Sequence, residues 1–366
     1  MQINKLSRLL FSFRCYRLKY FSTDQKGALL SLGNEILCPI TLLSYFPPVK
    51  YAVAYGSGVF PQTTAVVPAT PPMLDFIFAV NDPSAWHEKN MRMNPTHYSS
   101  LAVLGGANWI ARVQESKLGA GVWFNTLVPV PQDALSGSVY PKQQRLMKYG
   151  VVSIQSLMND LTLWNSLYIA GRMHKPIKNL LWPDSTASCP SGLDTAVKQN
   201  LHSALCAALL ALPTEFNSYQ LYSAITGLSY GGDWRMAFGE DPNKVNNIVV
   251  NNASAFHTLY SPLFIQAPFS QLLSHVPREG PLGDFSLDVS PSAVSHLRSG
   301  LPLPIQKRLS AAPNKKTKPL NFHLAQIVAA SSRGQGILGL ISAGPLKALS
   351  YSAAKVVKAM RGKLHR

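Results

Sequence analysis

The sequence predicts a mixed fold of the α/β or α+β class, in which helices cover a mixed β-sheet. Four short apolar runs rich in β-branched and aromatic residues, at 49–55, 73–80, 121–130 and 148–154, are typical of buried strands. Segments with helical patterning lie between and after these runs, and that alternation favours a layered sheet-and-helix domain. At 366 residues, the chain is long enough to hold two domains with extensions.

The stretch 49–80 carries the most informative chemical pattern. Its first strand ends in Gly56-Ser57-Gly58, where two glycines allow a sharp bend and let N–H groups face an anion such as phosphate. The second strand is apolar except for Asp75. A lone carboxylate in such a strand must lie at an edge, pair with a cation or bind a metal, because burying it without a partner is costly. The two features together predict a phosphate-binding bend beside a Mg²⁺ ligand, which is the arrangement that a nucleotidyltransferase needs.

The positive charge of the chain is concentrated at its two ends. The net charge is +17, yet residues 24–288 carry 16 Lys and Arg against 17 acids. Residues 1–23 carry five basic residues and residues 289–366 carry thirteen, and neither segment has an acid. An enzyme that acts on nucleic acid usually has its basic surface around the cleft. The near-neutral middle therefore argues against nucleic acid as a partner.

The N-terminal segment 1–23 has the composition of a mitochondrial presequence, because it is basic, acid-free and rich in aromatic residues. A disordered basic tail or a nuclear signal is the alternative. No stretch offers about 20 continuous apolar residues, so any membrane contact is expected to be peripheral.

The cysteines indicate a reducing compartment. They form no CxxC pair and are too scattered for a disulfide framework in a chain of this size. We therefore expect free thiols and no zinc site. The four residues are Cys15, Cys38, Cys189 and Cys206.

The other segments are predicted to be helices and a linker. Segment 34–46 is predicted to be a helix that stops at Pro47-Pro48. Segments 198–212 and 215–228 are predicted to be two helices of a small module packed on the sheet domain. Residues 288–322 are rich in Ser, Pro and Lys and are predicted to be a linker.

The C-terminal segment 346–366 has the pattern of a basic amphipathic helix. Lys347, Lys355 and Lys358 lie off its apolar stripe. Such a helix is suited to an anionic membrane interface, and docking on the protein itself is the alternative. The residues of the stripe are Leu346, Leu349, Ala353, Val357, Met360 and Leu364.

Basic side chains in the middle of the chain are candidates to bind a triphosphate. Arg172 and Lys175 stand close together in the segment 167–177. Arg235 follows Asp233 in the segment 229–249, whose glycines would let the backbone approach a ligand. The alternatives are solvent-exposed bases and, for 229–249, a polar turn before a capped helix that starts at Asp241. The candidate bases are Lys148, Arg172, Lys175 and Arg235.

Five blocks of sequence together resemble one known family. They are YGSGVF, MLDFIFAVNDPSAWH, KYGVVS, LYIAGRMHKP and SYGGDWRMAFGEDPNKVNNIV, and they occur in the family's order between about residues 30 and 260. The chain resembles the mitochondrial phosphatidate cytidylyltransferase family, also called the mitochondrial translocator assembly and maintenance protein family. A Gly-Ser-Gly bend alone would be a weak signal, whereas five ordered blocks are specific.

The resemblance implies an α+β fold with a nucleotidyltransferase-like mixed-sheet domain, a smaller helical, winged-helix-like domain and a C-terminal region with an amphipathic helix. The expected boundaries are 1–23 for the presequence, 24–190 for the nucleotidyltransferase domain, 191–260 for the winged-helix-like domain and 261–366 for the C-terminal region. The last of these is expected to contain a basic linker and to contact the inner membrane peripherally from the matrix side. The oligomeric state is left open.

The resemblance also implies Mg²⁺-dependent transfer of CMP from CTP to phosphatidic acid. The products are CDP-diacylglycerol, which feeds cardiolipin synthesis, and pyrophosphate. The phosphatidate phosphate is itself the nucleophile, so catalysis is expected to rest on positioning and charge neutralisation. The expected metal ligand is Asp75. The expected catalytic residues are Asp75, Ser57 and Asp233. The expected nucleotide-binding residues are Gly56, Ser57, Gly58, Lys148, Arg172, Lys175 and Arg235.

One departure from the wider nucleotidyltransferase pattern concerns the metal. That pattern has two acids, Asp-x-Asp, on the second strand, and the second position is Ile77 here. Asp82 or Asp233 is therefore the expected source of a further ligand. Two other functions stay open: a nucleotidyltransferase that acts on RNA or a small acceptor, and a non-catalytic membrane-bound factor for mitochondrial protein import.

Overall fold

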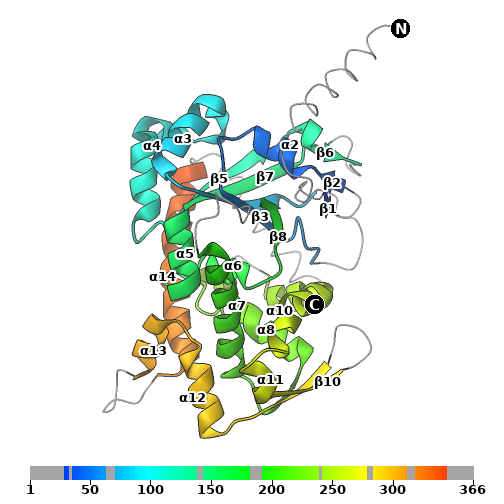
Figure 1. Cartoon of the computed structure of the whole chain (residues 1–366). Helices are drawn as coiled ribbons and strands as arrows, with labels where there is room; N and C mark the ends of the chain where they lie inside the picture. The colour runs from blue at the N-terminus through cyan, green and yellow to red at the C-terminus, as the bar shows by residue number, and fades with distance from the viewer. Residues whose placement is uncertain are drawn as a thin grey trace.

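The computed structural model describes residues 29–32, 35–62, 71–137, 143–181, 192–238, 241–277, 283–310 and 318–343. The predicted presequence and the predicted helix at 346–366 lie outside these ranges. The described residues form an α+β fold with two units, one built on a five-stranded sheet and one mainly helical (Figure 1). The predicted fold class is therefore confirmed.

The larger sheet is mixed and has the strand order β5-β7-β4-β3-β8. The strands β4 and β7 are parallel, and the other neighbours are antiparallel. Each of the four predicted strands is present. In chain order the strands are β3 (Tyr51–Tyr55), β4 (Leu74–Val80), β5 (Val122–Pro129), β7 (Leu146–Ser153) and β8 (Lys178–Leu181).

The two faces of this sheet are buried against different layers, because successive side chains of a strand point to opposite sides. On β4, Phe76 and Phe78 belong to one apolar cluster with Leu42. Ile77 belongs to another with Leu157. The first layer contains β1 (Leu30–Leu32), β2 (Glu35–Leu37), α2 (Pro39–Ser44), η2 (Gln132–Ala134) and β6 (Leu135–Ser136). The second contains α5 (Ile154–Leu163) and α6 (Ala170–Met173).

The predicted helix at 34–46 is wrong in its first part, where β2 pairs with β1 and β6. Cys38 precedes a proline and has an extended backbone (φ −91°, ψ 105°), as residues before proline prefer. The helix α2 therefore begins only at Pro39, where the fixed φ of proline suits a first helical position.

Helices at the β5 edge complete the first unit. They pack Tyr98, Ala102 and Ile110 around Trp123 of β5. These elements are α3 (Pro83–Met93), η1 (Pro95–His97) and α4 (Ser100–Glu115).

The second unit combines helices with a small antiparallel sheet of order β10-β11-β9. The predicted helix at 215–228 begins with the strand β9, because Asn217 forms a capping box with Gln220 and starts the helix only at Ser218. The predicted domain limit at residue 260 falls inside α10, and the pairing of β9 with β11 carries the unit to Leu287. Its elements are α7 (Leu193–Leu209), β9 (Glu215–Asn217), α8 (Ser218–Gly227), α9 (Trp234–Phe238), α10 (Lys244–Phe264), α11 (Phe269–Leu272), β10 (Leu273–Pro277) and β11 (Gly283–Leu287).

Two helices occupy much of the predicted linker at 288–322, so that prediction is wrong for the described residues there. They are α12 (Pro291–Ser299) and α13 (Leu303–Ser310). The Ser290 hydroxyl caps α12, and the apolar residues Leu297, Leu301 and Ile305 are buried. Ser and Pro therefore act here as helix-start residues and not as linker residues.

The long helix α14 (Leu320–Ala343) spans both units (Figure 1). Its Ser332 carbonyl accepts a hydrogen bond from the Trp234 indole of α9 at 3.2 Å. The Gln335 amide donates to the Val122 carbonyl of β5 at 2.9 Å. Within the described residues, no helix combines the length and apolar character that crossing a bilayer requires.

Candidate active site

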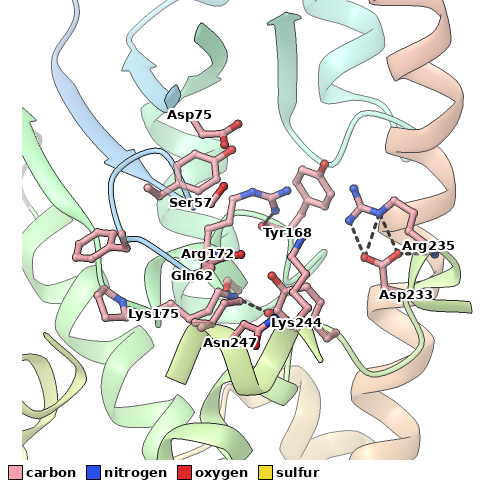
Figure 2. Close-up of a pocket in the computed structure, with 18 of the residues that line it drawn as sticks. Ser57, Gln62, Asp75, Tyr168, Arg172, Lys175, Asp233, Arg235, Lys244 and Asn247 are labelled. Carbon is pink, nitrogen blue, oxygen red and sulfur yellow. Dashed lines mark hydrogen bonds and ion pairs between the residues drawn. The ribbon is translucent and has the colours of Figure 1, made fainter. Parts of the chain in front are cut away.

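A cavity of about 510 Å³ lies between the two units, within the size range of small-molecule sites. Both units and α14 contribute to its wall. Figure 2 shows side chains from these elements pointing into one space. The polar and aromatic lining residues used below are Tyr55, Gly56, Ser57, Gln62, Asp75, Lys148, Tyr168, Arg172, Lys175, Tyr230, Asp233, Arg235, Asp241, Lys244, Asn247, Asn252, Ser331 and Ser332.

Asp75 lies at the start of β4, on the sheet face that looks toward the second unit. In the strand register it is flanked by Tyr55 of the antiparallel neighbour β3 and by Lys148 of the parallel neighbour β7. Ile77, two residues further along the same face, is fully buried in the core. The position where the wider nucleotidyltransferase pattern has a second acid is thus a packing position here, and Asp75 is at the cavity wall.

The glycine–serine bend stands directly against that carboxylate. Gly56 has a φ of 80°, and a Cβ added to it would lie 3.0 Å from Oδ2 of Asp75. Its carbonyl accepts the N–H groups of Val59 and Phe60 at 3.1 and 2.8 Å, which closes the turn. Ser57 lines the cavity beside Asp75 (Figure 2). The bend and the aspartate, eighteen positions apart in the chain, therefore share one site as the sequence predicts.

Gly58 is not among the described residues that line the cavity. A Cβ at Gly58 would lie 2.4 Å from the Met73 carbonyl, so this glycine allows the loop to pack against the entry to β4. Behind it, the buried Arg145 approaches the Gly58 carbonyl at 3.5 Å and pairs with Glu35 at 3.4 Å. Gly58 therefore occupies a packing position and is not one of the residues that line the cavity.

Arg172 is positioned by a buried carboxylate that the sequence patterns did not single out. Asp160 of α5 accepts the N–H groups of Leu167, Ile169 and Ala170, each at 2.9 Å. It also accepts the N–H and hydroxyl groups of Ser166, at 2.9 and 2.8 Å. These bonds fix the turn that leads into α6, and Arg172 is on that short helix.

The Arg172 guanidinium lies between two aromatic rings, 4.0 Å from the centroid of Tyr168 and 5.6 Å from that of Tyr55. Burial alone would raise the pKa of Tyr168. The charges of Arg172, Arg235 and Lys148 outweigh burial and lower this pKa to about 8. These three cations around Tyr168 make this part of the cavity favourable to a polyanionic ligand.

Lys175 extends the basic wall toward the second unit. Its ammonium group donates to the Ser229 hydroxyl at 2.7 Å and to the Gly171 carbonyl. The Tyr230 ring stands between Lys175 and Lys244, with centroid distances of 5.1 and 5.9 Å. Burial, together with the charges of Arg172 and Lys244, holds the pKa of Lys175 well below its ordinary value.

Asp233 lines the cavity, but its carboxylate is bound to Arg235. The guanidinium approaches both carboxylate oxygens, with the shortest distance 2.6 Å, and the Arg235 N–H bonds to the same group at 3.0 Å. Figure 2 shows this pair at the side of the cavity next to α14. The other expected ligand, Asp82, is not among the lining residues. It caps α3 by accepting the N–H groups of Ser84 and Ala85 at 2.8 and 3.2 Å.

Comparison with known protein families identifies the family of this chain. A family model described as "Phosphatidate cytidylyltransferase, mitochondrial" matches residues 40–358. The chain belongs to this family.

Individual relatives agree with that assignment along nearly their whole length. Proteins of this name from Xenopus laevis and Danio rerio are 38% and 37% identical to the chain. The matches cover 87% and 92% of this chain, and 94% and 98% of the relatives. The protein of this name from Drosophila melanogaster is 39% identical over 85% of this chain and 94% of its own.

One carboxylate of the cytidylyltransferase cavity has surroundings that suit a divalent cation. The described residues contain no group of three or more His, Cys, Asp or Glu side chains that could hold a metal. Asp241, a third acid in the wall, accepts from the Asn243 N–H and the Asn247 amide at 2.9 and 2.8 Å. Mg²⁺ commonly takes one or two carboxylates and completes its shell with substrate phosphates and water. Asp75 fits that pattern, because the missing side chain of Gly56 leaves space beside Oδ2.

Sequence patterns missed the contribution of α10 to the cytidylyltransferase cavity. Asn252 donates to the Pro61 carbonyl at 3.0 Å, just beyond the glycine–serine bend. The helix is kinked at this residue (φ −132°, ψ 22°). Eight residues further on, the Tyr260 hydroxyl donates to the His174 carbonyl at 2.6 Å. Lys244 lies in the segment 229–249, which the sequence indicates as a ligand-binding candidate. Asn252 gave no signal, because its partner is a backbone carbonyl about 190 residues away.

The other cavity residues that the sequence did not indicate lie in segments whose patterns point to other roles. Tyr55 and Tyr168 occur in apolar runs, where aromatic residues indicate a core. Ser331 and Ser332 lie in α14, a helix that the sequence patterns did not predict. Gln62 lies in the segment 61–72 after the bend, whose many Pro, Thr and Ala residues are typical of an exposed loop.

Proposed function

We propose that this chain is a phosphatidate cytidylyltransferase that transfers CMP from CTP to phosphatidic acid. One observation carries the proposal: the glycine–serine bend and Asp75 line the same cavity as Lys148, Arg172 and Arg235. Catalysis of phosphoryl transfer is largely positioning and charge stabilisation, which this set of groups can supply. The names of the relatives support phosphatidate as acceptor.

In the proposed reaction the phosphatidate phosphate oxygen forms a bond to the α-phosphorus of CTP. The bond between the α-phosphorus and the bridging oxygen breaks, and pyrophosphate leaves with that electron pair. The acceptor is already an anion, so no serine or cysteine nucleophile is needed. The products are CDP-diacylglycerol and pyrophosphate.

Cationic side chains would hold the triphosphate and the acceptor phosphate. Arg172 carries a planar guanidinium that fits phosphate oxygens, and this group contacts the ring of Tyr168 and donates to the Tyr168 carbonyl. Ser57 would donate its hydroxyl to a phosphate oxygen. Asp233 would act as a positioning residue that aims Arg235, since its carboxylate is bound to that guanidinium.

Mg²⁺ is the proposed cofactor, and Asp75 is the residue that would hold it. When bound, the ion would neutralise negative charge on the phosphates and on the departing pyrophosphate. Lys148 lies beside Asp75 on the neighbouring strand, so a carboxylate and a cation lie at the same end of the sheet.

We place the enzyme in mitochondria, on the matrix side of the inner membrane as a peripheral protein, where its product would enter cardiolipin synthesis. The word mitochondrial in the relatives' names and the basic, acid-free segment 1–23 support this location. The acid-free segment 344–366, with six Lys and Arg, supports contact with an anionic membrane.

The deciding experiment incubates the purified chain with Mg²⁺, phosphatidate vesicles and CTP labelled in the cytidine. We expect label in the organic phase as a liponucleotide and an equal amount of pyrophosphate. Label transferred to RNA or to a water-soluble acceptor would replace this proposal by the first alternative. Absence of both CTP binding and turnover would favour the non-catalytic import factor.

A further inference from the structure

A second feature of the molecule lies outside the catalytic cavity, where α4 begins and α14 ends. Leu101, Val103 and Leu104 of α4 are 52%, 52% and 84% exposed. Ile337 and Leu340 of α14 are 50% and 59% exposed. We call these five residues the α4–α14 surface. Single exposed leucines are ordinary, but a group of large apolar side chains on two adjoining helices marks an interaction site.

The two helix ends are held together, so the surface is a fixed part of the fold. The Ser99 hydroxyl donates to the Ile341 carbonyl at 3.0 Å. Ile341 packs against the buried cluster that includes Tyr98 and Ala102. Because Ala102 faces inward, the neighbouring Leu101 and Val103 cannot reach the core.

The two chain segments that carry the surface are also free of charge. Residues 93–111 and 334–346 contain no Lys, Arg, Asp or Glu. A helix face on a soluble protein normally carries charged residues opposite its buried side. The exposed Arg333, one turn before Ile337, lies at the border of the surface. A protein partner recognised mainly by ion pairs would find few to form here, whereas the acyl boundary of a bilayer favours such a surface.

The chain beyond this surface identifies the partner. After Ala343 the sequence continues with residues 344–366, which carry six Lys and Arg and no acid. Basic residues beside an apolar surface are complementary to anionic phospholipid, because leucines enter the interface while Lys and Arg neutralise the headgroups. We propose that the α4–α14 surface docks the folded body on an anionic phospholipid bilayer, as a contact additional to the basic C-terminal segment.

This contact would set the position of the cavity relative to the lipid. Ser332 lines the cavity and Leu340 belongs to the surface. They are eight residues apart on α14, about 12 Å along the helix axis. A rigid helix thus connects the proposed membrane contact to the wall of the active site.

The test uses vesicles of phosphatidylcholine with and without an anionic phospholipid, and the full-length chain. Leu101→Asp combined with Leu104→Asp should weaken binding to anionic vesicles by at least about tenfold, since each leucine loses its burial in the interface. Ile265→Asp, at an 80% exposed position at the end of α10, is the matched control and should bind as the unaltered protein does. Turnover of a water-soluble, short-chain phosphatidate should be unchanged in all variants.

A second measurement does not depend on lost binding. Leu104→Trp should show a blue shift of tryptophan emission when anionic vesicles are added, and Ile265→Trp should show none. A blue shift would show that position 104 enters an apolar environment on the vesicle, and circular dichroism of the bound variant would show that it is folded.

Three results would overturn the proposal. The first is vesicle binding by the double aspartate variant equal to that of the control. The second is a dimer in the unaltered protein that the double variant abolishes, because the surface would then be a contact between copies. The third is an unshifted emission of Leu104→Trp when that variant is bound to anionic vesicles. If the unaltered protein binds vesicles but transfers no cytidylyl group, the proposed function would be contradicted and the membrane contact would not.

Discussion

The Asn252 side-chain amide of α10 donates a hydrogen bond to the Pro61 carbonyl at 3.0 Å, and this bond joins the second unit to the loop that follows the glycine–serine bend. Two turns along the same helix, Tyr260 bonds to the His174 carbonyl next to Lys175. Residues 252, 256 and 260 form one buried stripe at a spacing of four. One face of α10 therefore holds both sides of the cavity at a fixed separation.

Asn252→Ala should weaken CTP binding roughly two- to tenfold, the equivalent of one hydrogen bond of about 0.5–1.5 kcal/mol. Isothermal titration would measure the effect. Asn251→Ala is the control, because Asn251 donates only to the Asn247 carbonyl of its own helix. Equal CTP affinities of the two variants would show that the bond to Pro61 does not position the loop.

Asp75→Ala should abolish CMP transfer, with a loss of at least about 10²-fold, because it removes the carboxylate proposed to hold Mg²⁺. The fold should remain, since Asp75 is at the cavity wall and not in the core. Turnover and circular dichroism would be measured together. Asp82→Ala is the contrasting variant: it should cost about 1 kcal/mol of stability through the lost cap of α3 and leave turnover intact.

Gly56→Ala should lower turnover although it adds only a methyl group. The residue has a φ of 80°, which costs about 1–2 kcal/mol for alanine, and the new Cβ would lie 3.0 Å from Oδ2 of Asp75. Steady-state rates over a range of Mg²⁺ concentrations would check this. Gly231→Ala should be tolerated, because its Cβ would have an ordinary 3.7 Å contact. Normal turnover in Gly56→Ala would mean that the space beside the carboxylate is not needed.

Asp160→Asn should destabilise the protein by about 3 kcal/mol or more. An amide nitrogen would replace one carboxylate oxygen and would face N–H groups from the turn 166–170, leaving donors without an acceptor. Chemical denaturation would measure the change in the free energy of unfolding. Asp194→Asn, which affects only an exposed ion pair with Lys198, should change that free energy by less than about 0.5 kcal/mol. Similar stabilities of the two variants would contradict the role given to Asp160.

The sequence predicts that the glycine–serine bend and Asp75 share a site, because this follows from the order of the strands. The bend follows the end of β3, and Asp75 is the second residue of the antiparallel neighbour β4, so adjacency in the sheet brings them together. Asp160 and Asn252 were not predictable in the same way, because each bonds to backbone groups of a distant or irregular segment. The helices α12 and α13 were not predicted, because their Ser, Pro and Lys content resembles that of a linker. Ser290 and Pro291 in fact start a helix, and Leu297 provides its buried contact.

The pKa of Tyr168 predicts a pH dependence of nucleotide binding. Although burial would raise this pKa, the charges of Arg172, Arg235 and Lys148 lower it to about 8. Below that pH the phenol is neutral. Above it, the phenolate places a negative charge among the cations that are proposed to bind CTP. If only the neutral form binds, affinity should fall about tenfold one pH unit above the pKa.

Tyr168→Phe should not show this loss of CTP affinity above pH 8, because phenylalanine does not ionise. Lys175 also loses charge as pH rises, and its lowered pKa contributes in the same direction to both proteins. The informative quantity is therefore the ratio of the two CTP affinities across pH 7 to 9. That ratio should change with a midpoint near the pKa of Tyr168, and parallel profiles for both proteins would show that Tyr168 stays neutral throughout.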